Sequence, residues 1–551
     1  MIVVLLLVLA LVAPALATEP AVVQEGFRNF RTKSGYAKIS DSTLEITQMS
    51  FAEASTGSLL WENYEMSFKV TPLELGSQYA GFSVFFRSLG GHHCYSLNVT
   101  PTGVSLNRYH GVYTDRTVLA SYTSGIQLGE TAEVTLKAEG NEFAVFLNGR
   151  KIISAKDPLN MYPYGHITLR AELARLRFED WKVEAFEIQD PELRRRAELG
   201  YGLPVEVADG QMHPVQEGEN EPENIVLIYE QASGKNWITV DALPYVTYIS
   251  ESYQPLDWFF DTFLFLGLSA PGGRNFQGSP YAVRSDYEWW LDRLFANDKS
   301  GLWAFERAVG NNKYLLGDPD YKANVIIMIP YPNENPNTPF GEINGVQPVL
   351  SGNVQAAAKG RLSVVEWYIN EVLDRWEKAG FENLRLIGLY WNAESIDTTG
   401  IDGRYLPEVG KMVREHGLKF YWIPWYKAPG YSQWKDLGFD AVMLQPNYMF
   451  DHDISRTRLI TAASEARKYG LGMEIEADST VFTPEGRERY LDYLRAANSY
   501  GYASGVLKAF YQETSLLANA ALSSFPQDRE LYDITYDFLK GNFTEKLPII
   551  D

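Results

Sequence analysis

The sequence predicts a multidomain chain: an N-terminal all-β jelly-roll sandwich followed by a C-terminal TIM-like (β/α)8 barrel. Residues 22–187 contain short alternating strands between turn residues, which is typical of an antiparallel sandwich. Residues 223–545 contain apolar strands that alternate with helices, which is typical of parallel strands in an α/β fold. A chain of 551 residues is also longer than one hydrophobic core usually supports.

The prediction of a sandwich depends on a period of two. Residues 64–70 and 81–87 alternate apolar and polar side chains, so that one face of each strand can pack on a core. Asn148-Gly149 supplies the positive φ angles that a tight hairpin turn needs. This hairpin and the strand at 176–183 resemble the concanavalin-like or laminin-G-like jelly-roll modules that often accompany glycosidases.

The prediction of a barrel depends on a repeated pattern in which a helix ends at a glycine and an apolar strand follows. Glycine suits the left-handed position that ends a helix. These glycines are Gly380, Gly417, Gly438, Gly470 and Gly501. Further apolar strands at 225–229, 261–266 and 325–330 bring the expected number to eight, the number that closes a barrel. Residues 245–249 are a ninth strand or the true first one. An open doubly wound sheet is the alternative, but no glycine-rich phosphate loop follows a strand.

The first residues are apolar and lead into Ala13-Pro14-Ala15-Leu16-Ala17, a small-residue cleavage pattern. We interpret residues 1–17 as a signal peptide, with an uncleaved membrane anchor as the alternative. No later stretch is apolar for long enough to span a bilayer. We therefore expect a secreted or cell-surface protein with no transmembrane segment in the mature chain. Residues 188–222 are rich in charge, glycine and proline, and we expect a linker there.

Composition argues against several classes of function. A net charge of −21, from 70 acidic and 49 basic residues, disfavours nucleic acid as a partner. Cys94 is the only cysteine, so neither a disulfide framework nor a thiolate metal cluster is expected. Asp451-His452-Asp453 has no third ligand at a suitable spacing, and we interpret it as a polar loop. We expect no metal and no cofactor. The 14% of aromatic residues fits stacking on sugar rings and fits a large core equally well.

Two glutamates stand where a barrel places its reactive groups, at the carboxyl ends of strands. Glu394 follows the fourth strand and Glu476 ends the seventh. Their positions are similar to those in the large clan of retaining (β/α)8 glycosidases, which have an acid/base glutamate on strand four and a nucleophile on strand seven. That clan has asparagine directly before its acid/base, whereas Asn392 here lies two residues before Glu394. Because glycoside cleavage needs two carboxyl groups, we predict that Glu394 and Glu476 are the catalytic pair.

Alternatives remain at both positions. Glu394 could begin an ordinary loop helix. On strand seven, Glu474, Glu476 and Asp478 share one face by alternation, so Glu474 could be the nucleophile or the hydrogen-bonded partner of Glu476. Asp478 could instead cap the following loop.

The other candidates are expected to form sugar subsites. Tyr390, Trp391, Trp422, Trp425 and Tyr448 would partly desolvate Glu394 and raise its pKa, as a general acid requires. The remaining candidates are Asp261, Tyr331, Asn392, Gln445, Asn447, Glu474, Lys508, Tyr511 and Gln512.

Four sequence segments resemble those of a known family, at residues 243–248, 258–266, 287–292 and 325–332. Through them the part from about 224 to 541 resembles the bacterial family known as domain of unknown function 4855. The resemblance implies a glycosidase-like barrel in secreted or surface proteins, without implying an activity.

The sequence thus favours a glycoside hydrolase that acts on an extracellular or cell-wall polysaccharide. The clan resemblance implies a retaining mechanism. The N-terminal sandwich would be its glycan-binding module. A non-catalytic glycan-binding or cell-surface protein with a degenerate barrel is the alternative from another class. For a polysaccharide lyase, no Tyr/His/Arg constellation stands out. Linkage, exo or endo action and oligomeric state stay open.

Overall fold

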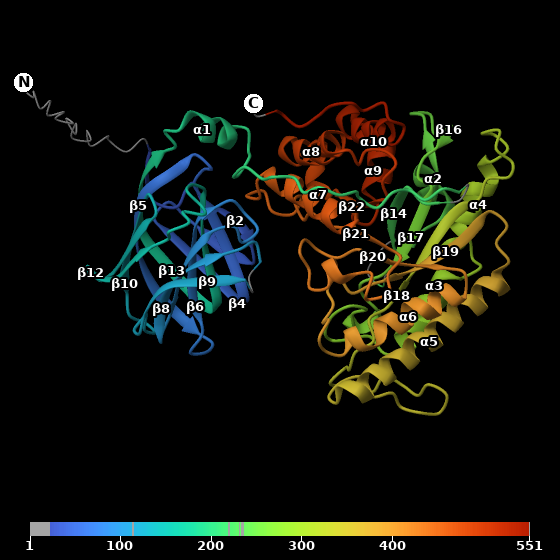
Figure 1. Cartoon of the computed structure of the whole chain (residues 1–551), viewed down its shortest axis with the longest axis horizontal. Helices are drawn as coiled ribbons and strands as arrows, with labels where there is room; N and C mark the ends of the chain where they lie inside the picture. Colours follow the sequence, from blue (N-terminus) through green and yellow to red (C-terminus); the bar gives the residue numbers. More distant parts are fainter. Residues whose placement is uncertain (1–21, 113–114, 219–220, 231, 233–235, 550–551) are drawn as a thin grey trace, which may run out of the picture. The chain divides into compact units, whose positions relative to one another are not determined.

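The computed structural model describes residues 22–112, 115–218, 221–230, 232 and 236–549. The predicted signal peptide at 1–17 lies outside the described residues. The chain divides into two compact units, Met1–Leu203 and Pro204–Asp551, each with its own hydrophobic core (Figure 1). Within the described ranges, no helix combines the length and apolar character needed to cross a membrane.

The first unit is built from one 13-stranded antiparallel sheet. Its strands are β1 (Val22–Glu25), β2 (Arg31–Ser34), β3 (Tyr36–Ile39), β4 (Thr43–Thr56), β5 (Trp61–Leu75), β6 (Gly81–Ser88), β7 (Tyr95–Thr100), β8 (Gly103–Tyr109), β9 (Arg116–Tyr122), β10 (Ala132–Glu139), β11 (Glu142–Leu147), β12 (Arg150–Lys156) and β13 (His166–Glu187). The 22-residue β13 pairs with β4, β5 and β6, so the sheet continues around an aromatic core. In that core Phe68 stacks on Trp181 at 5.8 Å between ring centres. The predicted all-β jelly-roll architecture is confirmed.

The predicted linker at 188–222 spans the boundary between the two units, after Leu203, and contains regular structure. Residues 191–198 form α1 (Pro191–Glu198), capped by Asp190, and Ala197 belongs to the core of the first unit. After residue 203 the chain joins the second unit, where the His213 N–H donates to the Leu471 carbonyl at 2.9 Å and the Leu507 N–H donates to the His213 carbonyl at 3.1 Å. A composition rich in charge and glycine did not reveal these backbone bonds.

The second unit contains a closed barrel of eight parallel strands, which confirms the predicted fold (Figure 1). The strands are β14 (Asn224–Tyr229), β17 (Thr262–Leu266), β18 (Ala323–Ile329), β19 (Leu384–Trp391), β20 (Lys419–Trp422), β21 (Ala441–Leu444), β22 (Gly472–Glu476) and β23 (Lys508–Tyr511). They are apolar on both faces because one face lines the barrel and the other packs on helices. Residues 245–249 are not a barrel strand, since they span the end of a helix and β15 (Thr247–Ile249), which pairs with β16 (Pro255–Trp258) in a separate hairpin.

Helices cover the outside of this barrel (Figure 1). They are α2 (Thr239–Val246), α3 (Arg284–Leu294), α4 (Leu302–Asn312), α5 (Val354–Ala379), α6 (Asp402–Glu415), α7 (Thr457–Tyr469), α8 (Pro484–Tyr500), α9 (Leu516–Leu522) and α10 (Pro526–Leu539), with the short 3-10 helices η1 (Pro271–Gly273), η2 (Tyr431–Gln433) and η3 (Ser479–Phe482). Gly380, Gly470 and Gly501 end α5, α7 and α8 in the left-handed conformation, as predicted. The helix expected before Gly438 is only the 3-10 helix η2.

Candidate active site

A pocket of about 240 Å³ lies at the carboxyl ends of the barrel strands. Tyr229, Tyr390 and Tyr511 reach it from the ends of β14, β19 and β23. The complete lining is Leu227, Tyr229, Leu266, Leu268, Gln277, Tyr390, Asn392, Glu394, Ile423, Gln445, Asn447, Phe450, Glu474 and Tyr511. The pocket therefore collects residues from most of the barrel, as active sites of this fold do.

Two carboxyl groups face this pocket, those of Glu394 and Glu474. Burial raises the pKa of Glu394, and a hydrogen bond with the Gln445 side chain offsets part of that effect. Burial, followed by the negative charges of Glu476 and Glu394, raises the pKa of Glu474 well above its usual range. Burial and mutual repulsion therefore disfavour the simultaneous ionisation of the two carboxyl groups.

Glu476 does not line the pocket, so the structure does not bring it together there with Glu394, its predicted catalytic partner. Its fully buried carboxylate accepts hydrogen bonds from the Asn447 N–H at 3.1 Å, the Tyr448 N–H at 3.2 Å and the Tyr493 hydroxyl of α8. Burial raises the pKa of Glu476 to about 7, although the hydrogen bonds from Tyr493, Asn447 and Tyr448 act in the opposite direction. Glu476 thus anchors the loop after β21, and Glu474 is the strand-seven carboxyl that the pocket exposes.

Side-chain amides surround the two carboxyl groups. The Asn392 amide donates to the Gly267 carbonyl at 3.1 Å, and Gln445 donates to the Ile423 carbonyl at 3.0 Å. Asn447 in turn donates to Gln445 Oε1 at 3.0 Å. These bonds fix the orientations of three predicted site residues that do line the pocket.

Asp261 and Lys508 lie at the opposite end of the barrel, which corrects their predicted role. Asp261 directly precedes β17 and accepts the Asn224 N–H at 2.8 Å. Lys508 begins β23, and its buried ammonium contacts Glu223 at 3.2 Å. Because the strands are parallel, residues at their starts cannot reach a pocket at their ends.

Two predicted aromatic residues do not line the pocket and pack on other parts of the barrel. Trp391 packs on Tyr405 of α6, with 6.0 Å between ring centres. Trp422 stacks on Phe439 at 5.1 Å and donates to the Ala393 carbonyl at 2.7 Å. Trp391 directly follows Tyr390, which lines the pocket, so alternation along β19 requires it to point outward.

The other candidates outside the pocket lining hold neighbouring structure together. Tyr331 donates to Asp402 at 3.1 Å and receives a hydrogen bond from Arg361 at 2.6 Å. The Tyr448 hydroxyl donates to Asp492 at 2.9 Å. Gln512 accepts from the Tyr245 hydroxyl at 2.7 Å and donates to the Leu227 carbonyl at 3.1 Å, and Trp425 accepts the Ala428 N–H through its backbone carbonyl at 2.8 Å.

Besides four aliphatic residues, the lining contains three polar or aromatic residues that were not predicted: Tyr229, Gln277 and Phe450. Tyr229 is the last residue of the first strand, so the rule applied to Glu394 could have found it. Gln277 and Phe450 stand in loops, where no periodic pattern marks which side chain turns inward.

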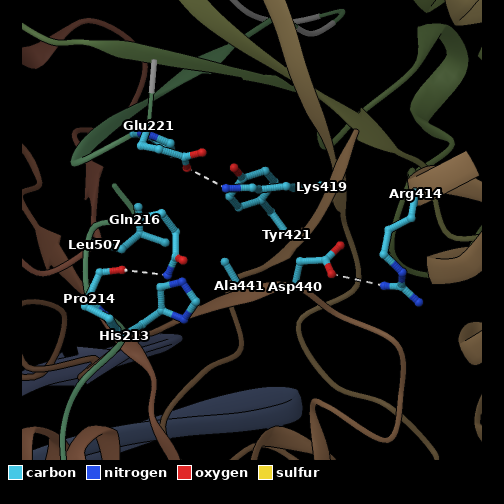
Figure 2. A pocket seen from close by; sticks show the side chains of 11 residues that line it. His213, Pro214, Gln216, Glu221, Arg414, Lys419, Tyr421, Asp440, Ala441 and Leu507 are labelled. Atoms are coloured by element: carbon cyan, nitrogen blue, oxygen red, sulfur yellow. Dashed lines mark hydrogen bonds and ion pairs between the residues drawn. The ribbon is translucent and has the colours of Figure 1, made fainter. Parts of the chain in front are cut away.

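A second hollow, of about 360 Å³, lies at the amino-terminal end of the strands and is shown in Figure 2. Lys419 forms an ion pair with Glu221 there, and Arg414 pairs with Asp440 at 3.1 Å. Burial, together with the charge of Lys419, lowers the pKa of His213. The two cations in this hollow, Lys419 and Arg414, are each paired with a carboxylate. The hollow is separate from the pocket that Glu394 lines. Across the described part of the chain, no cluster of three His, Cys, Asp or Glu side chains could hold a metal ion.

The closed barrel and its acidic pocket define a protein of the TIM-barrel class. The chain belongs to the family described as domain of unknown function (DUF4855), whose model matches residues 224–537. This confirms the resemblance seen in the sequence. No curated protein matches the chain significantly.

Three of the solved structures with similarity to the chain each cover between 29% and 31% of it. The carbohydrate-binding module CBM66 from Bacillus subtilis is 18% identical, covers 29% of this chain and 96% of its own, and has a TM-score of 0.25. A protein of unknown function with a galectin-like fold from Bacillus subtilis is 13% identical, covers 31% and 99%, and also has a TM-score of 0.25. LamAcat from Zobellia galactanivorans is 10% identical, covers 30% and 97%, and has a TM-score of 0.24. We draw no functional conclusion from similarity at this level.

The raised carboxyl pKa values predict that stability increases on acidification. Burial raises the pKa of Glu476 from 4.5 to about 7 and that of Asp261 from 3.8 to about 6. The folded state therefore binds more protons than the unfolded state between pH 4 and 7, and its stability falls as pH rises through that window. We expect the Tm of the barrel, measured by calorimetry, to be several degrees higher at pH 5 than at pH 8 (about 1.4 kcal/mol per pKa unit).

Glu476→Gln tests the cause of this dependence, because it removes one titrating carboxyl and keeps the side-chain size. The variant should show a flatter profile of Tm against pH. A Tm that rises from pH 5 to pH 8 in the unaltered chain would contradict the assignment of these pKa shifts.

Proposed function

We propose that the barrel is a glycoside hydrolase that acts on an extracellular or cell-wall polysaccharide. The observation that carries this proposal is the presence of two carboxyl groups, Glu394 and Glu474, in one small pocket at the carboxyl ends of the strands. Glycoside cleavage requires such a pair, with one carboxyl protonated and the other ionised. Burial raises the pKa of both carboxyl groups, more strongly that of Glu474, so the pair keeps a proton at higher pH than exposed carboxyl groups would, and the roles proposed below require that proton to lie on Glu394 when substrate is bound.

The proposed reaction is a double displacement. Glu474 attacks the anomeric carbon while Glu394 gives its proton to the leaving oxygen, so the glycosidic bond breaks as the glycosyl-enzyme ester forms. Glu394, now ionised, takes a proton from water, and the resulting attack on the anomeric carbon releases Glu474 and the sugar. The positions of the two residues, after strand four and on strand seven, support this division of roles.

The rest of the chain takes a supporting part in this proposal. Secretion through the segment at 1–17 would place the protein among extracellular glycans. The N-terminal sandwich would bind glycan and hold the polysaccharide near the barrel, as an accessory module.

The test is release of reducing sugar from a panel of polysaccharides and oligosaccharides by the mature chain. Hydrolysis of at least one glycan, lost in the double variant Glu394→Gln/Glu474→Gln, is the expected result. Glycan binding without hydrolysis by the unaltered chain would favour a non-catalytic binding protein and overturn the proposal.

A further inference from the structure

The charged side chains that line the candidate pocket are both acidic, and no basic side chain lines it. Glu394 and Glu474 both face it. Around Tyr511, which completes one wall, further carboxylates gather: after burial, the charges of Glu513, Glu474 and Asp478 raise the pKa of its phenol. An anionic ligand would therefore meet like charge in a poorly solvated space, which is strongly unfavourable.

Arg458, whose charge acts on Glu476, is engaged elsewhere. The charge of Arg458 lowers the pKa of Glu476, but its buried guanidinium donates to the Pro446 carbonyl at 2.9 Å and lies 4.1 Å from the centre of the Tyr426 ring. Arg458 does not line the pocket. Its charge is therefore unavailable for contact with a ligand.

The pocket also has a surplus of hydrogen-bond acceptors. Asn392 is only 1% exposed, and its amide nitrogen donates to the Gly267 carbonyl, so Oδ1 must accept. That oxygen has no hydrogen-bond partner within the described part of the protein. Gln445 and Asn447, by contrast, use their donors on protein acceptors. A buried acceptor without a partner is costly, so a ligand N–H that enters beside Asn392 gains by drawing this oxygen, which is closed to solvent in this structure, into a hydrogen bond.

We propose, on the basis of the proposed function, that the pocket selects a sugar residue with a free, protonated amino group, held by Asn392 Oδ1, Glu394 and Glu474. An ammonium group has three donors and no acceptor, and its hydrogen bonds to carboxylates are charge-assisted. N-acetylation removes the charge and leaves a single N–H donor. A neutral hydroxyl offers one donor without charge, and a uronate is repelled.

Two further features agree with an amino sugar. A volume of about 240 Å³ is below the range of roughly 300–1,000 Å³ usual for drug-sized ligands, which favours a single sugar ring. A bound ammonium also supplies the positive charge that the pocket lacks. It would keep one of the two carboxyl groups ionised, as nucleophilic attack requires.

The test is binding of free monosaccharides, which are not hydrolysed, to the mature chain near pH 6 by calorimetry or ligand-observed NMR. The probes are glucosamine and galactosamine, their N-acetylated forms, glucose and galactose, and the corresponding uronic acids. We expect glucosamine, galactosamine or both to bind at least about tenfold more tightly than the corresponding N-acetylated and neutral sugars. The uronic acids should bind most weakly.

Two variants give matched controls. Asn392→Leu removes the unpartnered acceptor and should reduce the preference for the amino sugar about tenfold. Glu221→Gln removes a carboxylate at the opposite end of the barrel and should leave the preference unchanged. Equal or tighter binding of neutral, N-acetylated or acidic sugars overturns the inference, as does failure of both amino sugars to bind.

These results are distinguishable from a failure of the proposed function. Preferential binding of an amino sugar without hydrolysis of any glycan would overturn the proposed hydrolase function but support the inferred ligand class. Hydrolysis of neutral glycans without any preference for an amino group would support the proposed hydrolase function but overturn the inferred ligand class.

Discussion

Replacing Glu474 by glutamine is expected to abolish turnover almost completely, with a fall in kcat of about 10⁴-fold or more. Glutamine keeps the size and the place of the side chain in β22 but cannot attack the anomeric carbon. The change leaves the pocket shape intact, so a neutral sugar should still bind, whereas an amino sugar should bind more weakly because one carboxylate is lost. Single-turnover kinetics on a glycan identified by the panel would measure the loss.

Glu476→Gln is the matched control, since it alters a carboxyl two residues away on the same strand. Tyr448 and Tyr493 both donate to Glu476 Oε2, and a glutamine oxygen at that position keeps these two hydrogen bonds, while the amide nitrogen at the Oε1 position loses the one from the Asn447 N–H. This variant should keep a turnover at least tenfold above that of Glu474→Gln. A larger loss of turnover in Glu476→Gln than in Glu474→Gln would indicate that Glu476 is the nucleophile.

Replacing Glu394 by glutamine is expected to lower kcat by about 10²- to 10⁴-fold, the usual contribution of a general acid. The loss should depend on the leaving group. Substrates with acidic aryl leaving groups need little protonation, so their first step should be affected much less than cleavage of a natural glycosidic bond. Comparison of aryl glycosides with oligosaccharides measures this difference. Equal losses for both kinds of substrate would contradict an acid role for Glu394.

Much of the barrel could be predicted from the sequence because its signals are local. Buried parallel strands are continuous apolar runs, and glycines such as Gly380, Gly470 and Gly501 mark the ends of the preceding helices. The position of Glu394 after the fourth strand follows directly from the strand count. The ordered residues between the two units gave no such signal, because their backbone hydrogen bonds join segments far apart in sequence.

The choice between Glu474 and Glu476 depended on contacts that no local pattern contains. Alternation places both side chains on one face of β22. The Glu476 carboxylate accepts hydrogen bonds from Tyr493, which lies 17 residues further along, and from the loop after β21. Other errors were avoidable: Asp261 and Lys508 stand at the starts of their strands, and Trp391 neighbours an inward-facing tyrosine.

Chemical rescue by azide tests most directly whether Glu474 is the carboxyl group that attacks the sugar. Replacement of a nucleophilic glutamate by alanine leaves space in which a small anion can attack the anomeric carbon. Azide should restore the activity of Glu474→Ala on an activated glycoside and yield a glycosyl azide of configuration opposite to the substrate, while Glu476→Ala should show no such product. Formation of this azide by Glu476→Ala and not by Glu474→Ala would contradict the assignment.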